Sequence, residues 1–138
     1  MRIAVVDGQG GGIGRHIIEK LREGLPESVN ILALGTNAWA TSQMLKAGAN
    51  DGATGEAAIV WNADKVDVIT GTIGVLMAHS MMGEITPSIA AAIAASPARK
   101  VLLPINKCGV DVVGVELKPL PHLIDDMVAL IAGAGNVE

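Results

Sequence analysis

The chain has 138 residues, enough for one domain that buries about two-thirds of the surface of its unfolded chain. Half of the residues are apolar, but Phe and Tyr are absent and Trp39 and Trp61 are the only aromatics, so Ala, Val, Ile and Leu must fill the core. The net charge of -4 comes without a basic stripe, so nucleic acid is not an expected partner. We expect residues 1–138 to form a single α/β domain.

Neither a signal peptide nor a membrane span is predicted. The first expected strand begins at residue 2, which leaves no room for a signal peptide, and no apolar run reaches the ~18 residues of a membrane span. The single cysteine, Cys108, excludes an internal disulfide and fits a reducing compartment. These observations predict a cytoplasmic protein without a membrane partner.

The first half of the chain alternates short apolar runs with helical patterns. Residues 3–6 predict a strand, and residues 12–22 predict a helix that Gly24 and Pro26 end. Residues 29–34 predict a second strand, after which Thr36 or Asn37 caps a helix. Residues 50–55 carry the strongest internal loop signal, and a short helix is expected over 56–62.

The second half continues this alternation. Residues 66–70 predict a third strand, and a glycine-bearing turn over 71–74 leads into an apolar helix through Met82. Thr86 and Pro87 begin an Ala-rich helix over 87–95, which we expect to be buried on more than one side. Residues 101–105 and 110–115 predict two further strands, joined by a link so short that they must be antiparallel. The apolar stripe of a closing helix consists of Leu123, Ile124, Met127, Val128 and Ile131.

This alternation is typical of a three-layer, Rossmann-like domain with a doubly wound, mainly parallel sheet and an antiparallel edge strand. The strand orders 3-2-1-4 and 2-1-3-4 both fit the connections. In such sheets ligands bind beyond the carboxyl ends of the strands. Besides the loop that follows the first strand, the residues expected to converge there are Gly35, Thr36, Asn37, Gly71, Thr72 and Asn106.

The loop after the first strand, residues 8–14, is here called the glycine loop. It consists of Gly8, Gln9, Gly10, Gly11, Gly12, Ile13 and Gly14. A strand, a glycine turn and a helix N-terminus in this order gather bare backbone N–H groups at one spot, where the helix dipole also favours an anion. The loop therefore predicts a site for a small phosphate-bearing ligand. The alternative is that the glycines only let the strand and the helix pack closely.

The pattern Gly8-x-x-x-Gly12-Ile13-Gly14 resembles the fingerprint of short-chain dehydrogenases. The resemblance covers the first strand, loop and helix, and it implies a dinucleotide whose pyrophosphate lies on the loop. The catalytic Tyr of those enzymes has no counterpart, because this chain has no Tyr. Nor does an acidic residue end the second strand to bind a ribose hydroxyl, since Thr36 and Asn37 stand there.

The whole chain resembles a family of short bacterial proteins that is described only as a domain of unknown function. The resemblance lies in residues 6–14, 35–38, 53–56, 83–87 and 103–106, which span nearly the full length. It supports the boundaries of the domain and implies no reaction.

Three residues are candidates for catalysis. Cys108 lies beside Lys107, a cation that favours a reactive thiolate, although a lone cysteine also serves as a small apolar residue. Glu56 and Glu84 lie among Gly and Thr, where each carboxylate is suited either to act as a general base or to stabilise a helix start. His, Cys, Asp and Glu show no metal-ligand spacing, so no metal site is predicted.

Two hypotheses follow. The first is a nucleotide-binding or dinucleotide-binding protein, with NAD(P) as the favoured ligand of residues 8–14 and with the reaction, if there is one, left open. The second is a non-catalytic module that senses a nucleotide or anion and thereby sets its assembly. The apolar composition and the helix over 87–95 fit a homodimer, although burial inside one chain explains them equally.

Overall fold

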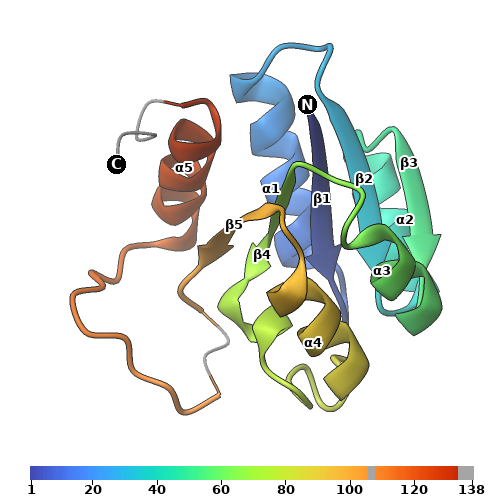
Figure 1. The fold of residues 1–138 in the computed structure, drawn as a ribbon. Coiled ribbons are helices and arrows are strands. Elements are labelled where there is room, and N and C mark those ends of the chain that lie inside the picture. Colours follow the sequence, from blue (N-terminus) through green and yellow to red (C-terminus); the bar gives the residue numbers. More distant parts are fainter. Residues whose placement is uncertain (106–107, 134–138) are drawn as a thin grey trace.

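Strand β1 lies at the centre of a parallel sheet. The computed structural model describes residues 1–105 and 108–133, and in these residues five strands follow the order β3-β2-β1-β4-β5 (Figure 1). All neighbouring pairs of strands are parallel. The strands are β1 (Arg2–Asp7), β2 (Asn30–Gly35), β3 (Asp51–Thr54), β4 (Val68–Thr72) and β5 (Arg99–Leu103). The predicted Rossmann-like, doubly wound α/β fold is therefore confirmed.

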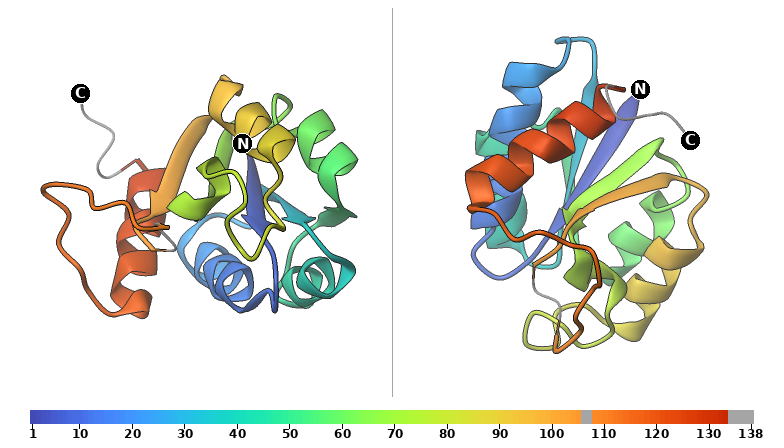
Figure 2. Two further views of the ribbon diagram at one scale, coloured as in Figure 1. Left: turned by 90° about the horizontal axis from the view of Figure 1, so that it is seen from below. Right: turned by 90° about the vertical axis from the view of Figure 1, so that its left-hand side faces the viewer.

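Helices cover both faces of this sheet, which makes three layers (Figure 2). One face carries α1 (Gly12–Gly24), α2 (Ala38–Lys46) and α5 (Leu120–Ile131). The other carries α3 (Glu56–Asn62), the short 3-10 helix η1 (Ile73–Leu76) and α4 (Pro87–Ala95). In the described part of the chain, no helix combines the length and the apolar character that crossing a membrane requires.

The core is aliphatic and lies on both faces of β1. Ile3 and Val5 pack towards α1 and α5, whereas Ala4 and Val6 pack towards η1 and α4, and all four are at most 1% exposed. A strand that is buried on both faces has a continuous apolar sequence, and this run is what predicted β1. Trp39 and Trp61 are 60% and 64% exposed, so the expectation of a core without aromatic rings is confirmed.

Local signals placed several boundaries well. Helix α3 has the predicted bounds, and α1 extends two residues past the predicted end to Gly24. Asn37 caps α2, because its Oδ1 accepts the Ala40 amide at 2.9 Å. Thr86 caps α4 through the Ile89 amide at 3.2 Å, with Pro87 in the first turn. Four residues of the stripe predicted for the closing helix are the buried residues of α5, and the fifth, Val128, is partly buried.

Strand β3 corrects the loop predicted over residues 50–55. It is an edge strand that pairs only with β2, with Leu32 opposite Asp51 and Gly35 opposite Thr54. Its side chains are mostly exposed, so no alternation of apolar and polar residues marked it as a strand. Counted over the first four strands that the sequence predicted, the order is 2-1-3-4, and β3 extends it beyond β2.

The apolar helix predicted through Met82 is also wrong. Only residues 73–76 are helical, and the chain then makes a series of turns up to Ile85. His79, Met81 and Met82 have φ angles of 71°, 55° and 55°, which a right-handed helix does not allow. The turns return the chain to the core, where Ile85 is fully buried and its carbonyl accepts the His79 amide at 2.6 Å.

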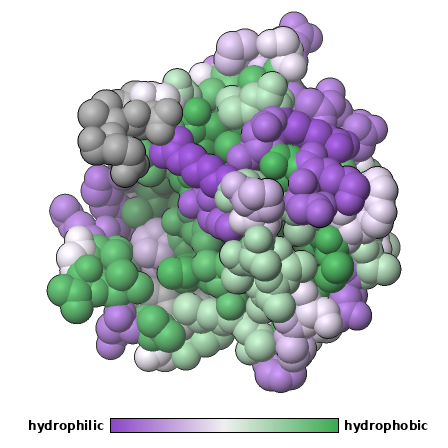
Figure 3. Space-filling view, viewed as in Figure 1, coloured by the Kyte–Doolittle hydropathy of each residue, from purple (hydrophilic) through white to green (hydrophobic). Residues whose placement is uncertain are grey.

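No strand forms over residues 110–115, so the predicted antiparallel edge strand is not present in the described part of the chain. Residues 110–118, here called the arm, project from the sheet before α5 begins (Figure 1). Every residue of the arm is exposed, and Val113 is 100% exposed beside Gly114, in a turn closed by the Val115 amide and the Val112 carbonyl. Apolar side chains gather where the arm projects, at the left of Figure 3.

Helix α4 is buried on one side rather than on several, which corrects the expectation for residues 87–95. Ile89, Ala90 and Ile93 face the core, while Ala91 and Ala94 are exposed. Ala satisfies helix propensity on a solvent-facing surface as well as in a core, so an Ala-rich sequence does not by itself indicate burial.

Candidate functional site

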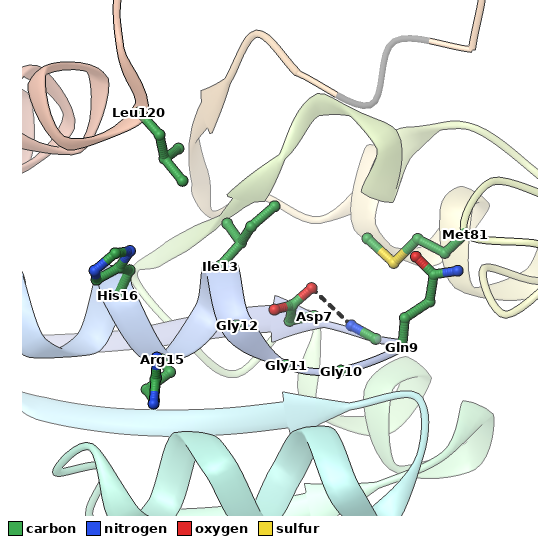
Figure 4. A pocket seen from close by; sticks show the side chains of 11 residues that line it. Asp7, Gln9, Gly10, Gly11, Gly12, Ile13, Arg15, His16, Met81 and Leu120 are labelled. Atoms are coloured by element: carbon green, nitrogen blue, oxygen red, sulfur yellow. Dashed lines mark hydrogen bonds between the residues drawn. The ribbon is translucent and has the colours of Figure 1, made fainter.

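A hollow of about 370 Å³ lies beside the glycine loop, at the carboxyl end of β1. Ile13, His16 and Leu120 stand at one end of it, and Gln9 and Met81 at the other (Figure 4). Strands β2 and β3 lie on one side of β1, and β4 and β5 lie on the other. The hollow is next to β1, where the order of the strands reverses its direction. Open α/β sheets bind their ligands at such a point.

The protein itself occupies several amides of the glycine loop. Gly8 and Gly14 donate to the two carboxylate oxygens of Asp7, at 2.8 and 2.6 Å. Gln9 donates to Glu84 Oε1 at 2.7 Å, and Gly11 donates to the Gly8 carbonyl at 2.9 Å. Protein acceptors thus cap part of the loop in which the sequence predicted several bare amides. In the described part of the chain, the amides of Gly10, Gly12 and Ile13 have no protein acceptor.

Asp7 is a buried carboxylate inside the site. It is 5% exposed, ends β1 and lines the hollow. Burial raises the pKa of this carboxyl group above its usual 3.8, the hydrogen bonds from the Gly14 and Gly8 amides oppose that rise, and the charge of Glu84 adds to it. Asp7 therefore closes the glycine loop onto β1 and places negative charge next to the open amides.

Glu84 joins three segments that are distant in the sequence. Its Oε1 atom accepts the Gln9 amide, the Thr36 hydroxyl at 2.5 Å and Asn37 Nδ2 at 3.0 Å. Burial raises the pKa of Glu84, but these three hydrogen bonds outweigh burial and hold the pKa below its usual 4.5. Glu84 therefore stays ionised at neutral pH and connects the loop after η1 with the carboxyl ends of β1 and β2.

The model of one family, "Domain of unknown function (DUF3842)", matches residues 2–135. The chain belongs to this family. No curated protein matches the chain. Among solved structures, a dodecameric FMN-dependent UbiX-like decarboxylase from Escherichia coli O157:H7 is 12% identical, with 100% of this chain and 96% of that chain covered and a TM-score of 0.45. A universal stress protein in complex with cAMP is 19% identical, with 72% of this chain and 94% of that chain covered and a TM-score of 0.38.

In this member of the family, most of the predicted binding residues lie at the carboxyl ends of the strands β1, β2 and β4. Gly35 ends β2, and Thr36 and Asn37 follow it beside the glycine loop, where the Thr36 amide donates to the Asp7 carbonyl at 3.0 Å. Gly71 and Thr72 end β4, and the buried hydroxyl of Thr72 has no hydrogen-bond partner among the described residues. Asn106 lies outside the described residues.

The three catalytic candidates do not meet at the hollow. Glu56 is in the first turn of α3 and accepts the hydroxyl of Thr86. Glu84 accepts the Gln9 amide of the glycine loop. Cys108 precedes the arm and is exposed. Residues 1–105 and 108–133 contain no group of three or more His, Cys, Asp or Glu that could hold a metal ion.

The glycines of the loop differ in the space around them, which bears on whether they serve packing alone. An added Cβ at Gly14 would lie 2.6 Å from Met44 Sδ and 2.9 Å from Asp7 Cβ, so this glycine lets α1 pack on β1 and α2. A Cβ at Gly10 or Gly12 would meet nothing within 4 Å. Packing therefore explains Gly14 but leaves Gly10 and Gly12 without a structural requirement.

Sequence reasoning missed the role of Asp7 and the contacts of Glu84. For Asp7 a signal was available, because a carboxylate that directly precedes a glycine turn and ends an apolar strand has backbone amides within reach. For Glu84 no local signal existed, since its partners Thr36 and Asn37 lie 48 and 47 residues away.

Proposed function

We propose that this protein binds a small phosphate-bearing ligand, a nucleotide or dinucleotide with NAD(P) favoured, in the hollow beside the glycine loop. The observation that carries the proposal is the set of three amides, those of Gly10, Gly12 and Ile13, that line the hollow without a protein acceptor among the described residues. Gly12 and Ile13 form the start of α1 and Gly10 directly precedes its N-cap Gly11, so all three lie where the helix dipole favours negative charge. Space for the ligand is supported by the volume of the hollow.

The charges around the hollow restrict which ligands bind well. Arg15 and His16 line it, but so does the Asp7 carboxylate, and Glu84 binds the adjacent Gln9 amide. Negative charge so close to the open amides opposes a free anion. Inorganic phosphate alone is therefore expected to bind weakly, and a nucleotide gains affinity from contacts of its sugar and base with the rest of the hollow.

Replacing Gly12 by Val is expected to abolish ligand binding without destabilising the protein. A valine side chain at this position enters open space next to the free amides and fills part of the hollow. Gly12 is exposed and does not require a left-handed φ, and valine has a higher helix propensity than glycine, so the substitution is expected to change the free energy of unfolding by less than about 1 kcal/mol. We expect the melting-temperature increase given by the best of NAD+, NADP+, ATP, FMN and coenzyme A to disappear in Gly12→Val.

The matched control is Glu19→Val, which places the same side chain on the exposed surface of α1, outside the residues that line the hollow. This variant loses a negative charge, so it is expected to bind an anionic ligand at least as well as the wild type. If no ligand of the panel raises the melting temperature of the wild-type protein, the proposed function is wrong. Equal shifts in the wild type and Gly12→Val would place the ligand elsewhere.

A second candidate function, an assembly module controlled by the same ligand, is favoured by the arm. Five of its residues are exposed and apolar: Val110, Val112, Val113, Val115 and Leu117. The arm continues through Pro119 into Leu120, which lines the hollow. A ligand that contacts Leu120 is therefore next to the point where the arm joins α5. A second copy of this chain offers the arm a complementary surface, because the arm carries Asp111 and Glu116 while the edge strand β5 carries Arg99 and Lys100.

Replacing Val113 by Asp is expected to reduce self-association. The side chain is fully exposed in the single chain, so the substitution leaves the fold intact, whereas burial of an unpaired carboxylate in a homodimer is costly. Sedimentation velocity over a range of protein concentrations measures the effect, with Leu130→Asp on the exposed side of α5 as the control. A wild-type chain that stays monomeric with and without ligand would exclude the assembly module.

A further inference from the structure

We propose that Glu84, which borders the hollow through its bond to the Gln9 amide but is not among the residues that line it, binds the ribose hydroxyls of the ligand and thereby selects nucleotides whose 2′-hydroxyl is free. This inference rests on the proposed function. In dinucleotide-binding sheets an acidic residue near the end of the second strand accepts the hydrogen bond of the ribose 2′-hydroxyl. Here Thr36 and Asn37 follow β2 instead, and the structure brings the carboxylate of Glu84 to them from another part of the chain.

The path of the chain explains how a distant residue reaches this place. After η1 the segment of turns contains His79, Met81 and Met82 in left-handed conformations, followed by Gly83 with a φ of 92°. These residues reverse the chain so that Ile85 enters the core and Glu84 faces the glycine loop. Left-handed conformations cost free energy at residues other than glycine, and they concentrate at functional sites.

The contacts of Glu84 leave one oxygen for a ligand. The three donors that reach this carboxylate, the Gln9 amide, the Thr36 hydroxyl and Asn37 Nδ2, all bind the same atom, Oε1. In the described residues, Oε2 has no hydrogen-bond donor. An ionised carboxylate only accepts hydrogen bonds, so the group that suits Oε2 is a donor such as a hydroxyl.

The charge of Glu84 defines what the site rejects. A ribose that carries a 2′-phosphate would place a second anion against this carboxylate, and no Arg or Lys of the described part of the chain is hydrogen-bonded to Glu84 to offset the repulsion. A 2′-deoxyribose would leave the carboxylate without its ligand donor. Both changes are therefore expected to weaken binding, the first through repulsion and the second through a lost charged hydrogen bond.

The test compares NAD+ with NADP+, and ADP with 2′-deoxy-ADP, by isothermal titration calorimetry. The wild-type protein is expected to prefer NAD+ and ADP by about tenfold or more. In Glu84→Gln the preference for NAD+ over NADP+ is expected to fall below about threefold, because the amide removes the repulsion. Glu19→Gln removes one negative charge from the exposed surface of α1 and is expected to retain the wild-type preference.

The outcomes separate this inference from the proposed function. If none of the four nucleotides binds to the wild-type protein, the proposed function fails and this inference fails with it. If all of them bind and the wild type does not discriminate between the members of each pair, only the role of Glu84 is excluded. The wild-type comparison is decisive even if Glu84→Gln does not fold. If Glu84→Gln folds and still prefers NAD+ over NADP+ as strongly as the wild type, the inference is also wrong.

Discussion

Gly71→Ala is expected to destabilise the protein by about 2–6 kcal/mol, a large effect for a single added methyl group. An added Cβ at Gly71 would lie 2.6 Å from the carbonyl oxygen of Val6, an atom of the neighbouring strand β1. The φ angle of 155° adds strain for any residue with a Cβ atom. Relief requires β1 and β4 to separate at the end that leads into the glycine loop, and urea unfolding followed by circular dichroism measures the cost.

Gly10→Ala is the control for this substitution. It adds the same methyl group two residues into the glycine loop, where nothing lies within 4 Å, and it is expected to change the free energy of unfolding by less than about 1 kcal/mol. If Gly71→Ala and Gly10→Ala unfold at the same urea concentration, the inference that a Cβ atom at Gly71 clashes with the Val6 carbonyl is wrong. Loss of soluble protein in Gly71→Ala alone agrees with the expectation.

Asp7→Asn is expected to destabilise the protein by about 1–3 kcal/mol at neutral pH. The two oxygens of Asp7 accept the Gly8 and Gly14 amides, and an asparagine keeps only one acceptor while turning its own NH2 group towards the other amide. A buried donor that loses its acceptor accounts for the cost, and removal of the buried charge offsets part of it. The free energy of unfolding in urea provides the measurement.

The cost of Asp7→Asn should also depend on pH. Because the pKa of Asp7 in the folded state lies above 3.8, the folded protein binds a proton more readily than the unfolded chain. Asp7 therefore stabilises the wild type increasingly as the pH falls through the raised pKa towards 3.8, and Asp7→Asn lacks this gain. We expect the difference in stability between the two proteins to grow on acidification.

Asp67→Asn is the matched control, because Asp67 accepts the Arg2 amide at 2.7 Å in an exposed position just before β4. Its substitution is expected to cost less than about 1 kcal/mol. A difference between wild type and Asp7→Asn that shrinks on acidification would contradict the burial of an ionised Asp7.

The parts of the fold that the sequence predicted well are those whose signals are local. β1, the glycine loop and α1 follow one another as an apolar run, a set of glycines and a helical stripe. Helix α4 begins where Thr86 and Pro87 provide a cap and a fixed φ. The side chains and backbone preferences within a few residues determine these structures, so no knowledge of the rest of the chain is needed.

The parts that were predicted wrongly depend on distant partners. β3 exists because β2 offers a free edge to a polar segment, and its Asp51 and Gly52 have low strand propensity. The segment of turns after η1 has an apolar composition that favours a helix, but Ile85 and Glu84 have their contacts in the core and at β2. For the same reason the position of the glycine loop between β1 and α1 could be predicted, whereas the hydrogen bonds of its amides to Asp7 and Glu84 could not.

The positions of the two tryptophans determine what fluorescence can report about this protein. Because both indole rings are largely surrounded by water in the native state, their emission will change little when the core comes apart, so unfolding must be recorded by far-ultraviolet dichroism or calorimetry. Trp39 lies two residues beyond Asn37, whose side chain bonds to the Gln9 carbonyl at 3.1 Å. We therefore expect a ligand that binds beside the end of β2 to change the emission of Trp39.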